Sequence, residues 1–173
     1  MVDRCNAVGV RIYADIVINH MCGGGGTGTG TAGTYFDANT EDFPAVPYSA
    51  ADFNDGKLLY LFWLVSLLDL NQGKDYVRGK IIDFMNDLTS LGIAGFRVDA
   101  CKHMWPNDLE VIFGSLNDLP TSKGFSGGSR PFIYQEVIDQ GGESITASEY
   151  LSFGRVTEFK YGINLYNNKD KPQ

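Results

Sequence analysis

The stretch Gly95-Phe-Arg-Val-Asp-Ala100 decides the fold, because it combines the pattern of a buried strand with two charged side chains. Successive side chains of a strand point to opposite faces, so Arg97 and Asp99 share one face and their apolar neighbours share the other. Two opposite charges on a short apolar strand are costly unless they pair or serve a function. On these residues alone, a structural ion pair and a functional site are equally good interpretations.

Helical patterns flank this strand on both sides. Before it, apolar residues recur at steps of four and three, which is typical of one helix face, and Gly92 is suited to end the helix. After it, Pro106 marks the start of a second amphipathic helix. The predicted apolar faces are Val77, Ile81, Phe84, Leu88 and Leu91 in the first helix and Leu109, Ile112, Phe113 and Leu116 in the second.

Further strand patterns lie at residues 8–18, 131–138 and 156–161, where β-branched and aromatic residues are frequent. Thr146 and Glu149 have the spacing of a capping box, which predicts the start of a short helix. Strands that alternate with helices are typical of a parallel sheet built from β-α units. We therefore expect an α/β fold.

The composition is that of a soluble globular protein with an acidic surface. The 173 residues are 43% hydrophobic, enough for one core, and the net charge of −7 argues against nucleic acid or an anionic membrane as partner. The apolar run Leu58–Leu68 is shorter than the roughly 20 residues of a membrane helix. The three cysteines give no disulfide framework of their own, and the first residues do not form the apolar segment of a signal peptide.

Residues 22–34 are rich in Gly and Thr and contain a formal Gly-x-Gly-x-x-Gly pattern that starts at Gly23. No amphipathic helix follows this pattern, which disfavours a dinucleotide site. We expect a flexible surface loop here instead.

Polar residues stand at the ends of three predicted strands, in the motifs Asp15-Ile-Val-Ile-Asn-His20, Arg97-Val-Asp-Ala100 and Phe132-Ile-Tyr-Gln-Glu-Val-Ile-Asp139. In this order they resemble motifs of the alpha-amylase family of glycoside hydrolases, and of its animal members in particular. The stretches 42–48 and 155–162 add to the resemblance, which covers nearly the whole chain.

The resemblance implies a fragment of a (β/α)8 TIM barrel, of which a complete copy needs about 250 residues. The fragment corresponds to about strands 3 to 6, with residues 1–20 and 71–173 in the partial barrel. Residues 21–70 correspond to a shortened, irregular calcium-binding subdomain inserted after the third strand. Within it, Leu58–Leu68 replaces a longer polar segment that includes one calcium ligand in the family.

The resemblance also implies catalytic roles, with Asp99 as nucleophile and Glu136 as general acid/base of a retaining hydrolysis. Glycoside hydrolysis needs two such carboxyl groups. Beside Arg97, Asp99 is expected to stay ionised, whereas the apolar aromatic run that precedes Glu136 favours the protonated form of that residue. Without the resemblance, Glu136 would be interpreted as an ordinary carboxylate at a strand end.

Other family positions bind substrate or ions. His20 matches a residue that donates a hydrogen bond to the sugar, although a lone histidine is more often structural. Lys102 and His103 match substrate contacts, and Arg97 matches a substrate-site residue that is a chloride ligand in animal members. Asn19, Asp69 and the carbonyl group of His103 match calcium ligands, whose oxygen chemistry suits Ca²⁺; no ligand pair has a zinc-like spacing.

Two hypotheses from different classes follow. The first is an endo-acting, secreted alpha-amylase, monomeric at full length, that cleaves internal alpha-1,4 bonds of starch, glycogen and malto-oligosaccharides. The second is a defunct relative with at most glucan binding, because the family's third carboxylate has no counterpart in residues 1–173. An alpha-glucosidase fits residues 42–48 and 136–143 less well. Since four barrel strands leave two unpaired edges, we expect residues 1–173 alone to be inactive and to aggregate.

Overall fold

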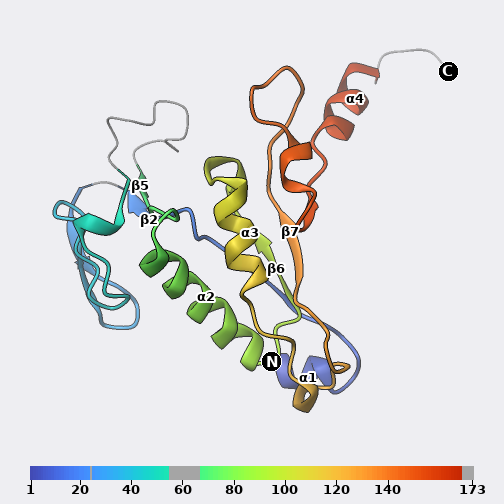
Figure 1. The fold of residues 1–173 in the computed structure, drawn as a ribbon, viewed down its shortest axis with the longest axis horizontal. Helices are drawn as coiled ribbons and strands as arrows, with labels where there is room; N and C mark the ends of the chain where they lie inside the picture. Colours follow the sequence, from blue (N-terminus) through green and yellow to red (C-terminus); the bar gives the residue numbers. More distant parts are fainter. Residues whose placement is uncertain (24, 55–66, 169–173) are drawn as a thin grey trace.

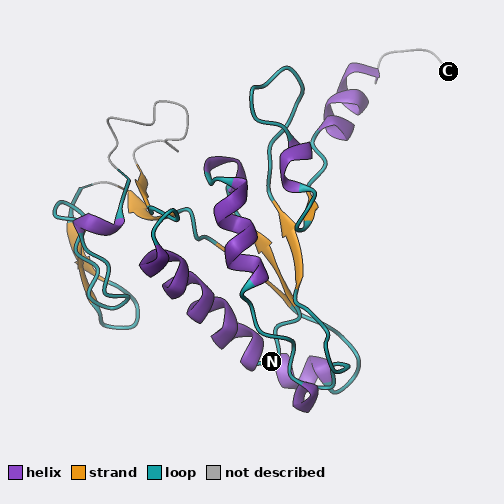
Figure 2. Ribbon diagram, viewed as in Figure 1, coloured by secondary structure: helices purple, strands orange, loops and turns teal. Residues whose placement is uncertain are grey.

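The computed structural model describes residues 1–23, 25–54 and 67–168. Within these ranges one parallel sheet of four strands, in the order β1-β6-β7-β8, forms the centre of the protein (Figures 1 and 2). The strands are β1 (Tyr13–Ile16), β6 (Gly95–Val98), β7 (Phe132–Gln135) and β8 (Arg155–Val156). The parallel pairing predicted from the alternation of strands and helices is confirmed.

Helices α2 (Asp75–Ser90) and α3 (Pro106–Gly114) precede and follow β6 and lie side by side (Figure 1). They bury apolar side chains together with Phe96 and Val98 of β6, which are both fully buried. The face of the sheet that carries Phe96 and Val98 is therefore the covered face. The start of α3 at Pro106 is confirmed, and its four predicted core residues are buried, although Leu116 lies two residues beyond the end of the helix.

The predicted apolar face of α2 is partly wrong. Val77 and Ile81 are buried, but Phe84 is 46% exposed, and the buried positions continue with Met85 and Thr89. The helix packs along a row of residues four positions apart, and this row leaves the apolar side chains at the other predicted positions nearer to solvent.

Two of the predicted strands are shorter than expected. The pattern at residues 8–18 pairs only at 13–16; it is preceded by α1 (Val2–Asn6), and Val8 and Val10 are exposed. The pattern at 156–161 pairs only at its first residue, and α4 (Lys160–Asn168) begins four residues later. β-Branched and aromatic residues favour a strand, but a strand forms only over the residues that have a neighbouring strand to pair with.

Residues 20–70 contribute two small antiparallel sheets beside the main sheet. Their strands are β2 (His20–Gly23) with β5 (Leu67–Asp69), and β3 (Thr27–Thr29) with β4 (Tyr35–Asp37). The Gly-rich segment is thus a hairpin rather than only a loop. Most of the apolar run Leu58–Leu68 lies outside the described residues, and the domain boundaries stay a prediction.

Four short 3-10 helices complete the described elements: η1 (Ala50–Asp52), η2 (Cys101–His103), η3 (Thr121–Lys123) and η4 (Ala147–Tyr150). The predicted capping box is confirmed, because the side chains of Thr146 and Glu149 both accept backbone hydrogen bonds at the start of η4. No helix in the described part of the chain has the length and apolar character needed to cross a membrane.

Gly95 is expected to be the glycine least tolerant of a side chain. A Cβ atom at this position would lie 2.2 Å from the carbonyl oxygen of Phe132 and 2.7 Å from the Tyr13 ring, so β6 would have to move away from both neighbouring strands. We expect Gly95→Ala to lower the free energy of unfolding by about 3 kcal/mol, as other overpacked cores do. Thermal and denaturant unfolding measure this change.

Gly79→Ala is the matched control. Gly79 lies inside α2, where a methyl group would meet nothing within 4 Å beyond the backbone of its own helix, and alanine is the better helix former. We expect this variant to gain about 0.5–1 kcal/mol of stability. Equal effects of the two substitutions would contradict the close approach of three strands at Gly95.

Candidate active site

The hydrogen-bond ladder of the main sheet continues one residue beyond β6 and β7. The backbone N–H of Asp99 donates to the carbonyl oxygen of Ile16 at 2.9 Å, and the N–H of Glu136 donates to the carbonyl oxygen of Val98 at 2.9 Å. Both carboxylates therefore leave the sheet at its carboxyl edge, where strands in parallel α/β folds present functional side chains.

Arg97 connects these carboxylates. Its guanidinium group contacts Oδ1 of Asp99 at 2.8 Å, Oε1 of Glu136 at 2.9 Å and Oδ1 of Asp15 at 2.8 Å. Hydrogen bonds from Arg97 to Asp15 and Asp99 raise the pKa of the guanidinium group, so it stays charged. One cation thus holds three carboxyl groups on the uncovered face of the sheet.

Sequence reasoning missed Asp15 as a partner of Arg97. The signal was present, because Asp15 opens the first motif and lies opposite Arg97 in the β1–β6 register. Its side chain is also the most exposed of the three carboxylates, at 61%. The pairing depends on a register between segments that are 82 residues apart.

The backbone at Ala100 turns towards Glu136. Ala100 has a φ of 51°, in the left-handed region that is uncommon for residues other than glycine. In this conformation its N–H donates to Oε2 of Glu136 at 3.0 Å, and the N–H of Cys101 donates to the Glu136 carbonyl oxygen at 3.0 Å. A strained turn that directs a donor at a carboxylate is a feature often found at functional sites.

The expected apolar setting of Glu136 is wrong. Its carboxylate is held by Arg97 and by the Ala100 N–H, both of which are polar. The aromatic rings of Phe132 and Tyr134 pack instead against Tyr13, with ring centroids 5.7 and 6.4 Å away. Alternation along the strand puts Glu136 on the same face as those rings. Because β7 ends at Gln135, however, Glu136 lies beyond the end of the strand and past the rings.

One cavity of about 200 Å³ brings four predicted site residues together: Asp99, Lys102, His103 and Glu136. Ala100 and Ile138 complete its lining. Lys102 extends along its side, where its Nζ donates to the Ile138 carbonyl oxygen at 2.7 Å and pairs with Glu143. The Lys102 hydrogen bond lowers the pKa of the Glu143 carboxyl group. Glu143 is a second neighbour that sequence reasoning did not include.

His20 lies at the start of β2, and its pKa responds to the charge of Asp99, which lines this cavity. Burial lowers the pKa of its imidazole, while the negative charge of Asp99 acts in the opposite direction. Its Nδ1 is 3.4 Å from Nδ2 of Asn19. His20 is not among the residues that line this cavity, and its role stays a prediction.

A second cavity of about 160 Å³ lies next to the first. Its lining is Asn54, Asp69, Asn71, Gln72, Gly73, His103, Trp105 and Asp108, so His103 borders both cavities. Burial raises the pKa of Asp69 to about 6, although hydrogen bonds from Asn54 and Asn19 partly oppose this. Oδ1 of Asp69 and Oδ1 of Asn19 are both buried without a hydrogen-bond partner.

These two orphaned oxygens fit a hard cation. Buried polar atoms normally have partners, and carboxylate and amide oxygens are ligands that Ca²⁺ takes. In the described ranges no three His, Cys, Asp or Glu side chains gather as a metal site, so a site here depends on amide and carbonyl oxygens. By contrast, Arg97 faces three carboxyl groups, and these residues by themselves do not fit a chloride ion.

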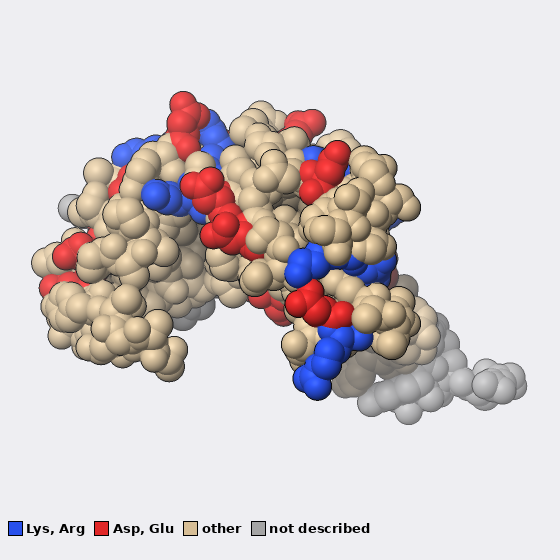
Figure 3. Space-filling model, turned by 90° about the horizontal axis from the view of Figure 1, so that it is seen from below, with Lys and Arg blue, Asp and Glu red and all other residues tan. Residues whose placement is uncertain are grey.

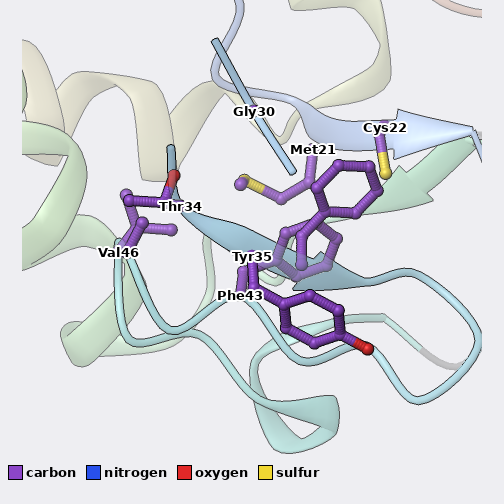
Figure 4. Close-up of a pocket in the computed structure, with 9 residues that line it drawn as sticks. Met21, Cys22, Gly30, Thr34, Tyr35, Phe43 and Val46 are labelled. Carbon is purple, nitrogen blue, oxygen red and sulfur yellow. The ribbon is translucent and has the colours of Figure 1, made fainter. Parts of the chain in front are cut away.

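A third cavity, of about 230 Å³, lies in the small-sheet region between β2 and β4 (Figure 4). Its lining is apolar or weakly polar, with Met21 and Cys22 on one side and Tyr35, Phe43 and Val46 on the other. None of its lining residues carries a carboxyl group, so it lacks the pair of carboxyl groups that glycoside hydrolysis needs.

The surface in Figure 3 shows Lys and Arg side chains interspersed with Asp and Glu.

Curated relatives match almost the entire chain. An alpha-amylase of Oryzias latipes is 59% identical over 182 residues, which cover 95% of this chain and 35% of the relative. An alpha-amylase of Tribolium castaneum is 57% identical and the pancreatic alpha-amylase of Sus scrofa 55%, with coverage of 96% and 95% of this chain. The chain thus spans about 35% of the length of these relatives. No family model matches it.

Solved structures agree with this. The crystal structure of alpha-amylase I from Eisenia fetida superimposes with a TM-score of 0.92 at 46% identity, over 99% of this chain and 38% of that one. An alpha-amylase from Geobacillus thermoleovorans, at 15% identity and a TM-score of 0.66, shares the fold. The parallel sheet is therefore a fragment of a (β/α)8 barrel, as the sequence predicts. By sequence and by structure, this chain belongs to the alpha-amylase family.

Proposed function

We propose that residues 1–173 form part of an endo-acting alpha-amylase that cleaves internal alpha-1,4 bonds of starch and glycogen with retention of configuration. The observation that carries the proposal is the position of Asp99 and Glu136, which contact one guanidinium group and line one cavity. Two carboxyl groups on opposite sides of a glycosidic bond are what such hydrolysis needs. A variant of the Eisenia fetida protein was solved with maltohexaose, which supports an alpha-glucan substrate.

In the proposed reaction, Asp99 attacks the anomeric carbon while Glu136 gives its proton to the leaving glycosidic oxygen. A covalent glycosyl-Asp99 ester forms, and the shortened glucan leaves with its new hydroxyl group. Glu136 then takes a proton from water, whose oxygen displaces Asp99 and restores both carboxyl groups. Arg97 and the Ala100 N–H hold the two side chains in place and keep them aligned during both steps.

The remaining predicted residues are proposed to bind substrate around these two. His20, whose pKa responds to the charge of Asp99, is proposed to donate a hydrogen bond to a sugar hydroxyl group. Lys102 and His103 line the same cavity as the carboxylates and are proposed to contact the substrate. Arg97 as a chloride ligand stays a prediction, and no step depends on it.

Asn19, Asp69 and the His103 carbonyl group are proposed to hold Ca²⁺. Bound there, the ion supplies structural cross-linking between the small sheets and the barrel strands, since His103 follows β6 and Asp69 ends β5. It also gives the orphaned oxygens of Asn19 and Asp69 a partner. Residues 58–66 of the segment Leu58–Leu68, where the family has a further calcium ligand, lie outside the described residues.

Calcium is expected to stabilise the protein, because it binds the folded state only. At a concentration about 100-fold above Kd it should add about 2.7 kcal/mol to the free energy of unfolding. Asp69→Ala should abolish the rise in Tm that Ca²⁺ causes relative to chelator. Asp83→Ala, which removes an exposed carboxylate of α2, should keep the full rise. A rise that survives in the Asp69 variant would contradict the site.

The wider properties of the enzyme follow its family. We propose that it is secreted, that it is monomeric at full length, and that it has neither nucleic acid nor membrane as partner. A second candidate is a non-catalytic relative with glucan binding only.

A chimera tests the proposed function. Residues 1–173 replace the matching region of Eisenia fetida alpha-amylase I, and a second chimera keeps the earthworm residues opposite positions 55–66. We expect starch hydrolysis, with internal cleavage, from at least the second chimera. If both fold, as judged by circular dichroism, and neither hydrolyses starch, the function is wrong and the non-catalytic candidate is favoured. Activity of the second chimera alone would assign the defect to residues 55–66.

A further inference from the structure

The segment that follows Glu136 forms a closed loop beside the candidate active site. Residues 138–147 project beyond the carboxyl end of β7 and return to the protein at η4 (Figure 1). Ile138, the first residue of the loop, lines the cavity that contains Asp99 and Glu136. Its carbonyl oxygen accepts a hydrogen bond from Nζ of Lys102. The position of the loop therefore affects one wall of this cavity.

One carboxylate, Asp139, closes the base of the loop. Its Oδ1 accepts from the N–H of Gly141 at 3.0 Å, and its Oδ2 accepts from the N–H of Ala147 at 3.1 Å. Nζ of Lys160, at the start of α4, lies 3.4 Å from the same Oδ2. Because the Ala147 contact spans eight residues, Asp139 joins the start of the loop to its end.

The Asp139 side chain is buried, at 7% exposed, although the residues that follow it are exposed. A buried carboxylate is costly unless it is paired and hydrogen-bonded, and Asp139 has partners of both kinds. The hydrogen bond from the Ala147 N–H is the main cause of a lowered pKa at Asp139. The carboxyl group is therefore ionised at neutral pH, and its contacts are charge-assisted hydrogen bonds, which are stronger than neutral ones.

The far part of the loop brings Glu143 back to the cavity. Glu143 pairs with Nζ of Lys102, and its Oε1 accepts from the N–H of Gln140 at 3.4 Å. Lys102 thus has two partners on the loop, Glu143 and the Ile138 carbonyl group, and its side chain is only 22% exposed. A lysine loses much rotamer freedom when it is ordered. These contacts hold Lys102 in one position before a substrate binds.

We propose that Asp139 is a positioning residue of the active site, which fixes Lys102 through the loop and Glu143. Asp139 does not line the cavity itself. The inference rests on the proposed function, in which Lys102 contacts the substrate. Because the loop orders Lys102 in advance, binding does not have to order it, and affinity for the substrate rises. Asp139 thus contributes to binding, whereas Asp99 and Glu136 carry out the chemical steps.

The first test is Asp139→Asn in the active chimera. Asparagine is close to isosteric, but it replaces one acceptor oxygen with a donor, so it cannot accept from both Gly141 and Ala147, and it has no charge for Lys160. We expect KM for maltohexaose to rise about three- to tenfold, the cost of ordering one long side chain, while kcat stays within about twofold. A loss confined to kcat would overturn the proposal.

Glu143→Gln interrupts the same series of contacts one step closer to Lys102. It should raise KM to a similar extent, and the double variant with Asp139→Asn should be no worse than either single variant, because both act through one side chain. If the two increases in KM multiplied, Asp139 and Glu143 would act independently and the proposal would be wrong. Steady-state kinetics of the four proteins measure this coupling.

Asp37→Asn is the matched control. Asp37 also accepts hydrogen bonds from nearby residues of its own loop, with the Asn39 N–H at 2.9 Å, but it lies on β4 and does not line the catalytic cavity. It should leave KM and kcat unchanged. An increase in KM equal to that of Asp139→Asn would show a general effect of loosened loops and would contradict a specific role for Asp139.

A second readout does not depend on activity. Glutamyl endopeptidase cleaves after glutamate, and an opened loop exposes the bond that follows Glu143. We expect Asp139→Asn to be cut there about tenfold faster than the unmodified chimera, as mass spectrometry of the products shows, because cleavage follows the population of the open form. Lys160→Met removes only the cation from Asp139 and should change both readouts in the same direction, to a smaller extent.

The two readouts separate this proposal from the proposed function. If the unmodified chimera is inactive, the proposed function fails, and the cleavage rate alone decides whether Asp139 holds the loop. An unchanged cleavage rate in Asp139→Asn would overturn the proposal in either case. Faster cleavage with an unchanged KM would overturn it as well, since the loop would then move without any effect on the substrate. Should Asp139→Asn fail to fold by circular dichroism, the same outcomes in Lys160→Met decide.

Discussion

Asp99→Asn in the active chimera is expected to lower starch hydrolysis by about 10⁴-fold or more, because removal of a nucleophile from a hydrolase costs effects of this size. Asparagine is close to isosteric and can still accept from Arg97, whose Nη1 lies 2.8 Å from Asp99. The fold should therefore be kept, and Tm should change little. Initial rates on soluble starch and on a malto-oligosaccharide measure the loss.

Asp108→Asn is the matched control for this variant. Asp108 also pairs with an arginine, Arg78, at 2.7 Å, and its side chain is about as shielded as that of Asp99. It lies outside the catalytic cavity. At saturating calcium it should keep nearly the full rate. Similar losses in both variants would show that an arginine pair, rather than a nucleophile, matters at position 99.

Glu136→Gln is expected to lower starch hydrolysis by about 10²–10⁴-fold, the range that general acid/base groups contribute. The amide oxygen can still accept from the Ala100 N–H, which now contacts Oε2 at 3.0 Å, so the turn should persist. What is lost is the proton for the leaving group. Substrates with an acidic aryl leaving group need no such proton, and on these the loss should be much smaller.

The comparison of substrates separates the two roles. Asp99→Asn should lose activity equally on starch and on aryl glycosides, because attack at the anomeric carbon is needed for both. If Glu136→Gln lost as much on aryl glycosides as on starch, Glu136 could not be the proton donor. Kinetics of each variant on both substrates, with the unmodified chimera as reference, decide this.

Sequence alone predicted most of the site because its signals are local. Alternation along β6 places Arg97 and Asp99 on one face, and their 2.8 Å contact confirms this. The order of the motifs predicted that His20 and Glu136 approach them, since parallel strands end at the same edge. Contacts between neighbours on one strand, or between strand ends, follow from these two rules.

What sequence did not predict depends on register and on strand length. The contact of Asp15 with Arg97 requires a particular alignment of β1 and β6, and a shift of one residue would turn Asp15 to the covered face. The polar setting of Glu136 requires β7 to end at Gln135. Residues 157–161 have strand-like composition, but in the described part of the chain strand pairing ends at Val156 and α4 begins at Lys160.

The grouping of three carboxyl groups around Arg97 has a further consequence for the proposed reaction. With Glu136 protonated, Asp15 and Asp99 still outnumber the one guanidinium group, so the cluster keeps a net negative charge. The sugar ring develops positive charge as an oxocarbenium-like species when its bond to the leaving oxygen breaks. A fixed negative potential that is already in place favours this short-lived cation over the neutral ground state.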